Sequence, residues 1–284
     1  MLPTTKNSLR PQVILTQLKM VNALKIDDLK SFLDFKSQYY NNPEFIKEDP
    51  IQIPKLYTRK EDIEIMSLIM ATISWGNRTS IINSGRKLCN IFGESPLDFV
   101  LSINDESIKK LNFYHRTFNY YDFQFFIKSL KNIYLNKGGL ESIFSKYNDS
   151  SNFKNIEHFR SIFFSLKHEK RVEKHISSPN KGSSCKRLHM FLRWMVRNDK
   201  IVDFGIWKKL STSSLSCPLD VHTGRVARKL NLIKSKNNDI NALKELDSSL
   251  RKFDAVDPVK YDFALFGLGP VSYTHLTLPT IAEV

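Results

Sequence analysis

The chain has 284 residues, of which 41% are hydrophobic, and carries a formal net charge of +14. This size and apolar content suffice for an ordinary folded core. The sequence has no apolar run of about 18 residues and no apolar stretch of the kind found in signal peptides, which predicts a cytoplasmic protein without a membrane partner. Cys89, Cys185 and Cys217 are isolated, so we expect neither a disulfide framework nor a metal or other cofactor.

The N-terminal part of the chain predicts a leader followed by amphipathic helices. Residues 1–22 show little pattern and are expected to be poorly defined. Apolar residues recur at helical spacing over 27–40, and 50–54 is typical of an extended loop. Thr58-Arg-Lys-Glu61 has capping-box spacing, which predicts a buried helix that begins near Arg59 and ends before Gly76.

Further helices are expected along the rest of the chain, and strand signals are scarce. The expected ranges are 78–89, 96–101, 107–111, 121–136, 140–147, 156–168, 186–197, 220–230, 239–253 and 259–267. We therefore predict an all-α fold. Residues 270–284 have no Lys, no Arg and no helical period, and they resemble translated sequencing-adapter read-through. We expect this tail to be non-native.

Positive charge is concentrated between Lys181 and Lys234, a segment that contains twelve Lys or Arg residues and only three Asp residues. Charge runs are often solvated helix faces, but this surplus coincides with the most specific residue pattern of the chain. It therefore indicates a polyanionic partner.

Two helix starts lie within this basic segment. In the first helix, Leu188, Phe191, Leu192 and Met195 form one apolar face, and Lys186, Arg193 and Arg197 fall together on the opposite side. The second start follows Cys217-Pro-Leu-Asp220, where Pro218 and Asp220 are typical of a helix entrance. This pattern places a carboxylate at the start of a helix.

Gly182-Ser-Ser-Cys-Lys186, followed by Leu219-Asp220-Val-His222 and Arg225-Val226, resembles the helix–hairpin–helix DNA glycosylases of the endonuclease III and 8-oxoguanine glycosylase superfamily. More closely, residues 42–269 resemble a bacterial family of uncharacterised proteins assigned to that superfamily. The 34 positions between Lys186 and Asp220 exceed the endonuclease III spacing, which implies an insertion containing Trp207. The iron–sulfur loop of some relatives is excluded because no cysteine follows Cys217.

The resemblance implies two catalytic residues. Lys186 matches the lysine that attacks the sugar and forms a Schiff base, with its amine made neutral by desolvation and by Arg187 or Arg193. Asp220 matches the aspartate that stabilises the developing oxocarbenium charge. Read alone, Lys186 is a phosphate-binding lysine and Asp220 is a helix N-cap.

The resemblance also implies residues that bind DNA without reading its sequence, through backbone N–H groups and basic side chains. The expected set is Gly182, Ser183, Ser184, Arg187, Arg193, Arg197, Arg225, Asn77 and Arg78. Asn77 or Arg78 is placed to enter the space left by an extruded nucleotide, or Asn77 simply caps the next helix. His222 and Trp75 are possible accessory residues, and a structural role is also open for His222.

These inferences predict a glycosylase-like domain over 23–269, with one helical lobe over about 60–200 and another formed by 23–59 and 201–269. The expected function is removal of a damaged base, such as an oxidised purine, from duplex DNA, with AP-lyase activity. We expect a nucleoid-associated monomer. The alternatives are a non-catalytic DNA-binding module of the same fold and, more distantly, an RNA-binding protein.

Overall fold

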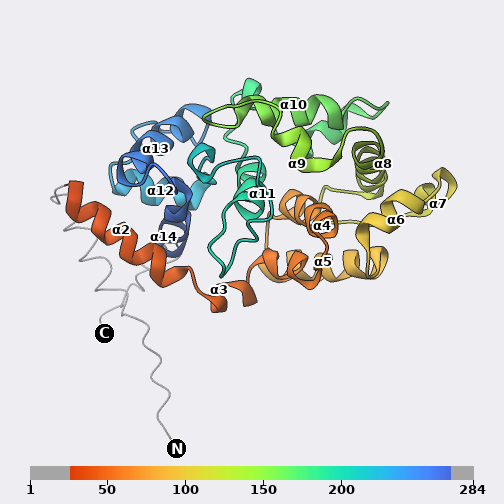
Figure 1. Cartoon of the computed structure of the whole chain (residues 1–284), viewed down its shortest axis with the longest axis horizontal. Helices are drawn as coiled ribbons and strands as arrows, with labels where there is room; N and C mark the ends of the chain where they lie inside the picture. The colour runs from red at the N-terminus through yellow and green to blue at the C-terminus, as the bar shows by residue number, and fades with distance from the viewer. Residues whose placement is uncertain (1–25, 270–284) are drawn as a thin grey trace, which may run out of the picture.

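The computed structural model describes residues 26–269, and this part of the chain is helical, as predicted (Figure 1). It contains no β-strand, only isolated backbone bridges that join His115 to Phe118 and Ser183 to Asp239. The expected leader and the expected non-native tail lie outside the described residues. None of the described helices combines the length and the apolar character needed to cross a membrane.

The chain begins with α2 (Ile26–Tyr40) and α3 (Pro43–Lys47), followed by two 3-10 turns, η1 (Pro50–Gln52) and η2 (Pro54–Leu56). The predicted extended loop over 50–54 is therefore wrong. A proline opens each turn with its φ already fixed, and the side chain of Asp49 accepts the N–H of Ile51 at 3.0 Å.

The next helices form the larger part of the molecule. They are α4 (Lys60–Ile73), α5 (Arg78–Phe92), α6 (Pro96–Ser102), α7 (Asp105–Lys110), α8 (Tyr120–Asn136), α9 (Gly139–Phe144) and α10 (Phe153–Phe163). The predicted capping box ahead of α4 is wrong, because the N-cap residue is Arg59 and no side chain caps the helix. The helices predicted over 140–147 and 156–168 both end earlier than expected.

The basic segment and the C-terminal helices complete the fold. The elements are η3 (Lys170–His175), η4 (Pro179–Lys181), α11 (Lys186–Val196), η5 (Thr212–Ser214), α12 (Val221–Lys229), α13 (Ile240–Phe253), η6 (Pro258–Lys260) and α14 (Tyr261–Leu268). Asp220 and Asp239 cap α12 and α13 by accepting N–H groups of the first turn, which is the expected role of such residues.

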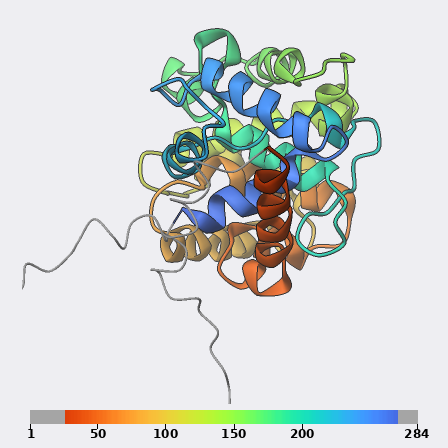
Figure 2. The same ribbon diagram turned by 90° about the vertical axis from the view of Figure 1, so that its left-hand side faces the viewer.

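Buried apolar residues form two clusters. The larger one contains residues between Ile51 and Leu215 together with Val259 and Phe263, and it centres on α4, α8 and α11. The smaller one joins Leu33 of α2 to residues of α12, α13 and α14. Figure 1 shows α11 between these two groups of helices, and Figure 2 shows α2 crossing the face of the second group. Along the chain, membership changes between Leu215 and Cys217, later than the expected lobe boundary near 200, but Val259 and Phe263 belong again to the larger cluster. The division into two lobes stays a prediction.

Candidate functional site

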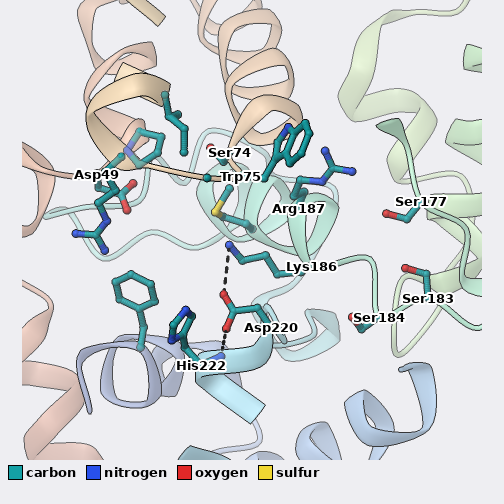
Figure 3. Close-up of a pocket in the computed structure, with 16 residues that line it drawn as sticks. Asp49, Ser74, Trp75, Ser177, Ser183, Ser184, Lys186, Arg187, Asp220 and His222 are labelled. Atoms are coloured by element: carbon teal, nitrogen blue, oxygen red, sulfur yellow. Dashed lines mark hydrogen bonds and ion pairs between the residues drawn. The ribbon is translucent and has the colours of Figure 1, made fainter. Parts of the chain in front are cut away.

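A cavity of about 770 Å³ opens where the two clusters meet (Figure 3). One side is built from η1, the link between α4 and α5, and the start of α11; the other side is built from the first turn of α12 and from α14. The lining residues are Asp49, Pro50, Ser74, Trp75, Gly76, Arg78, Ile81, Ser177, Ser183, Ser184, Lys186, Arg187, Met190, Asp220, His222 and Phe266. A cavity of this size is in the range that accommodates a small ligand.

Lys186 reaches the cavity from the first position of α11. A tight turn delivers it: Gly182 adopts φ +80°, and Cys185, directly ahead of the helix, adopts φ +46°. Gly182 has open space where a Cβ would lie, so its backbone conformation, rather than a close approach, favours glycine. The Lys186 side chain is 28% exposed and points toward Asp220 (Figure 3).

Asp220 uses its two carboxylate oxygens differently. Oδ1 accepts the N–H groups of His222 at 2.8 Å and Thr223 at 2.9 Å, which caps α12. Oδ2 lies 3.7 Å from Nζ of Lys186, and the Asp220 side chain is 25% exposed. Asp220 therefore caps α12 with one carboxylate oxygen and directs the other toward Lys186.

Hydrogen bonds inside the turn connect the two charged residues. The Ser184 hydroxyl donates to the carbonyl of Leu219 at 3.3 Å, directly before Asp220, and Ser183 Oγ accepts the N–H of Cys185 at 3.1 Å. Ser184 thus holds the start of α11 next to the start of α12, and Ser183 stabilises the turn itself. Both hydroxyl groups are thus engaged in local hydrogen bonds. The expected contacts of these serines to DNA stay predictions.

The expected helix–hairpin–helix motif is not confirmed. The segment ahead of the turn consists of η3 and η4, which are 3-10 turns rather than a regular α-helix. The N–H groups of Lys181, Gly182 and Ser183 already donate to the carbonyls of Ser178 and Pro179 at 2.9–3.2 Å. These three N–H groups are therefore used inside the protein, whereas we expected the N–H groups of the turn to bind phosphate.

The link between α4 and α5 forms an aromatic part of the cavity wall. Trp75 lines the cavity, and the guanidinium of Arg116 lies over its ring at 4.7 Å from the centroid. His115 is buried and forms hydrogen bonds with Ser84 at 2.9 Å and with the Trp75 carbonyl at 3.3 Å. Arg116 and His115, which do not line the cavity, thus fix the position of Trp75.

The two candidates for insertion into DNA lie beside this wall. Asn77 caps α5 by accepting the N–H of Ser80 at 3.2 Å, as its alternative role predicted. Arg78 lines the cavity, with its guanidinium 5.0 Å from the ring centroid of Phe266 and 3.8 Å from Glu48. Entry of either side chain into DNA stays a prediction.

The other predicted site residues divide between the cavity and its surroundings. Arg187 lines the cavity and donates to the Thr72 carbonyl, and burial lowers the pKa of its guanidinium. His222 is an exposed lining residue at the entrance of α12, whereas Arg225 lies one turn further along α12, outside the cavity lining.

The prediction that Arg193 and Arg197 bind DNA is wrong, because both side chains are buried in an ion cluster. Arg193 pairs with Asp203 at 3.2 Å and with Asp262, and Arg197 pairs with Asp199, Asp203 and Asp257 at 2.5–3.1 Å. Beyond the first turn, the face of α11 opposite its apolar stripe is covered by α14 and by the segment around Asp203, so this part of the face does not reach solvent. These guanidinium groups stabilise the interior and are not available to phosphate groups.

Sequence reasoning missed several lining residues, among them Asp49, Met190 and Phe266. They come from the N-cap of η1, from α11 and from α14, which are far apart in the sequence. Asp49-Pro50 is a recognisable helix-start pair, but no local pattern indicates that it faces Lys186. Within the described residues, no group of three His, Cys, Asp or Glu side chains is arranged to hold a metal ion.

The structure therefore defines an all-helical protein with a charged cavity between two apolar clusters. The chain belongs to the family described as "Protein of unknown function (DUF2400)", whose family model matches residues 49–271. This match includes both sides of the cavity. No curated protein and no solved structure matches the chain significantly.

Proposed function

We propose that this protein is a DNA glycosylase of the helix–hairpin–helix superfamily, with AP-lyase activity, that removes a damaged base from duplex DNA. The single observation that carries the proposal is the meeting of Lys186 and Asp220. Their side chains come from two helices and from residues 34 positions apart, yet they lie 3.7 Å apart in an open cavity. An amine and a carboxylate at that spacing are the two groups that the sequence resemblance requires.

The chemistry needs the target nucleotide to leave the base stack and enter the cavity. Neutral Lys186 Nζ then attacks the anomeric carbon, and the N-glycosidic bond breaks with its electron pair going to the base, which leaves with a proton. Asp220 Oδ2 faces this amine, so it is placed to accept a proton from the attacking nitrogen and to stabilise the cationic sugar. The C1′–O4′ bond of the resulting N-glycosylamine then breaks, and O4′ takes up a proton. This opens the sugar ring and gives the Schiff base from which the DNA strand is cleaved by elimination.

The charge around the cavity supports a polyanionic substrate. Lys186, Arg187 and Arg78 line the cavity together with the carboxylates of Asp49 and Asp220, so the lining carries a small positive surplus. Arg193 and Arg197 are buried, and the N–H groups of Gly182 and Ser183 already form hydrogen bonds inside the protein. The proposed DNA contacts are therefore Asn77, Arg78, Arg187, Arg225 and the backbone N–H of Ser184. Such contacts hold the backbone without reading sequence.

Borohydride trapping on lesion-containing and abasic duplexes tests the proposal. The wild-type protein is expected to form a covalent adduct, because borohydride reduces the Schiff base to a stable amine. Lys186→Gln is expected to abolish the adduct and to leave DNA binding measurable. Lys181→Gln is the matched control, since Lys181 is an exposed lysine five positions earlier whose side chain is 71% accessible. It is expected to trap normally.

Asp220→Asn keeps an oxygen that caps α12 but removes the negative charge. We expect base release to fall by about 10²- to 10⁴-fold, the usual range for an acid–base or electrostatic group. Salt-dependent DNA binding without trapping or excision on any lesion would contradict the proposal and favour a non-catalytic DNA-binding module.

A further inference from the structure

A second carboxylate, that of Asp49, lines the same cavity and has no part in the chemistry described above. Asp49 is 8% exposed and directly precedes the turn η1, more than 130 positions before Lys186. In Figure 3, Asp49, Ser74 and Trp75 lie on the opposite side of the Lys186 amine from Asp220. The cavity thus has a carboxylate on each of its two sides.

The position of Asp49 is fixed by its neighbours. Oδ1 accepts the N–H of Ile51 at 3.0 Å, and Ile51 itself is completely buried in the larger apolar cluster. Pro50 fixes the backbone between them. A side chain held by its own backbone in this way is preorganised, so little conformational freedom is lost when a ligand binds to it.

The carboxylate of Asp49 lies near cations but is not paired with one. Burial raises the pKa of Asp49, and the surrounding positive charges of Arg193, Arg78 and Lys186 oppose this shift. Within residues 26–269, however, Asp49 makes no ion pair, and Arg78 is engaged with Glu48 and with the ring of Phe266. A buried carboxyl group with a single backbone hydrogen bond retains the capacity to accept further hydrogen bonds.

We propose that Asp49 reads the extruded base by accepting hydrogen bonds from N–H donors on its edge, so that the site selects bases bearing amino or imide N–H groups. This inference rests on the proposed function. Lys186 and Asp220 act at the sugar, and a base attached to that sugar extends toward the opposite side of the cavity, where Asp49 lies. Trp75 and Phe266, which also line the cavity, supply aromatic surface for the ring. An ionised carboxylate only accepts hydrogen bonds, so it disfavours a base edge that carries only acceptors.

The test measures a base-dependent gain in affinity and does not require catalysis. Binding is compared between a duplex containing 2′-fluoro-8-oxoguanosine, which resists cleavage, and the same duplex with a tetrahydrofuran abasic analogue. The wild-type protein is expected to prefer the duplex with the base. Asp49→Asn keeps an oxygen for the Ile51 N–H, so it is expected to fold, which its thermal unfolding curve checks. It should lose about 10- to 100-fold of the preference and bind the abasic analogue as before.

The neighbouring Glu48 provides the matched control. Its side chain is 83% exposed and does not line the cavity, so Glu48→Gln removes one negative charge next to Asp49. Any effect on Arg78, which lies 3.8 Å from Glu48, acts on both duplexes alike. It is expected to keep the wild-type preference. The inference is overturned if Asp49→Asn keeps the full preference, if Glu48→Gln reduces it as strongly, or if the wild-type protein shows no preference at all.

Borohydride trapping on a natural abasic duplex separates this inference from the proposed function. Asp49→Asn is expected to trap like the wild-type protein, because no base remains to be read. Equal loss of trapping and of binding preference in Asp49→Asn would overturn the base-reading role. Absence of trapping in the wild-type protein, with the Asp49-dependent preference intact, would remove the proposed lyase chemistry and leave the role of Asp49 standing.

Discussion

The two ends of α11 place basic side chains in opposite environments. At the first turn, Lys186 is 28% exposed and lies 3.7 Å from Asp220, whose carboxylate also reaches solvent. At the other end, Arg193 and Arg197 are almost completely buried and share four carboxylates, those of Asp199, Asp203, Asp257 and Asp262. One helix face thus holds an open ion pair and a buried ion cluster.

This difference shows that the elements packed against a helix face, and not its residue pattern alone, determine whether its charged side chains are buried or open to solvent. Helical periodicity predicts correctly that Lys186, Arg193 and Arg197 share a side of α11. It does not indicate that α14 and the segment around Asp203 cover the later turns and leave the first turn at a cavity. Water competes with the open pair, whereas the buried guanidinium groups have only carboxylates and neighbouring rings to interact with.

The largest expected effect is on the buried cluster. Arg193→Met is expected to lower the free energy of unfolding by about 3–5 kcal/mol, because Asp203 and Asp262 would lose a buried cationic partner. Urea denaturation followed by circular dichroism measures this change. The loss should persist at high salt, since a buried pair is poorly screened.

Lys244→Met is the control for this experiment. Lys244 is an exposed residue in the middle of α13, so its replacement is expected to change the free energy of unfolding by less than about 0.5 kcal/mol. A similarly small change for Arg193→Met would mean that the cluster is solvated, and the contrast between the two ends of α11 would disappear.

Much of the helical fold follows from local sequence signals. Apolar periodicity predicts α2 and α11, Asp220 predicts the start of α12, and the expected ranges 96–101, 121–136 and 239–253 correspond to α6, α8 and α13. Errors arose where side-chain and backbone geometry were needed. The capping box at Thr58 does not form, and the prolines near Asp49 produce 3-10 turns in place of an extended loop.

The candidate site was only partly predictable. Lys186 and Asp220 were selected by their resemblance to a family motif, and the turn at Gly182 explains how α11 delivers the lysine. Asp49 and Phe266 lack such a motif, and their place in the cavity depends on how η1 and α14 pack against α11. Interior contacts of this kind bring together residues that no local pattern connects.

Glu64 is a buried carboxylate whose cationic neighbour, Lys60 at 3.9 Å, is 40% exposed, so its environment differs from that of the buried ion cluster. Glu64 is 2% exposed and accepts hydrogen bonds from Trp207 Nε1 at 2.6 Å and Tyr134 Oη at 2.7 Å, and burial raises its pKa from 4.5 to about 7. Because the pKa of Glu64 is higher in the folded state than in the unfolded state, its contribution to the free energy of unfolding is fully present below pH 4.5. This contribution is lost as the pH rises through 7. We expect the free energy of unfolding to fall by about 2–3 kcal/mol across that window from this group.

Glu64→Gln is expected to flatten this part of the pH profile, because the amide does not titrate. Urea denaturation at several pH values between 4.5 and 7 measures the slope. Glu106→Gln is the control, since Glu106 is an exposed carboxylate paired with Lys109, and it should leave the slope unchanged. An unchanged slope in Glu64→Gln would show that another group titrates in this range.

The smallest expected effect is on the open pair at the first turn of α11. A double-mutant cycle with Lys186→Gln and Asp220→Asn isolates its energy, since asparagine still caps α12 through its side-chain oxygen. Both side chains are about one-quarter exposed, so we expect a coupling below about 1 kcal/mol that decreases further in high salt. A coupling near the size of the Arg193 effect would place the pair in the same class as the buried cluster. A weak coupling instead means that Lys186 can exchange its partner for a substrate at little cost to the fold, which is the property that a nucleophilic lysine requires.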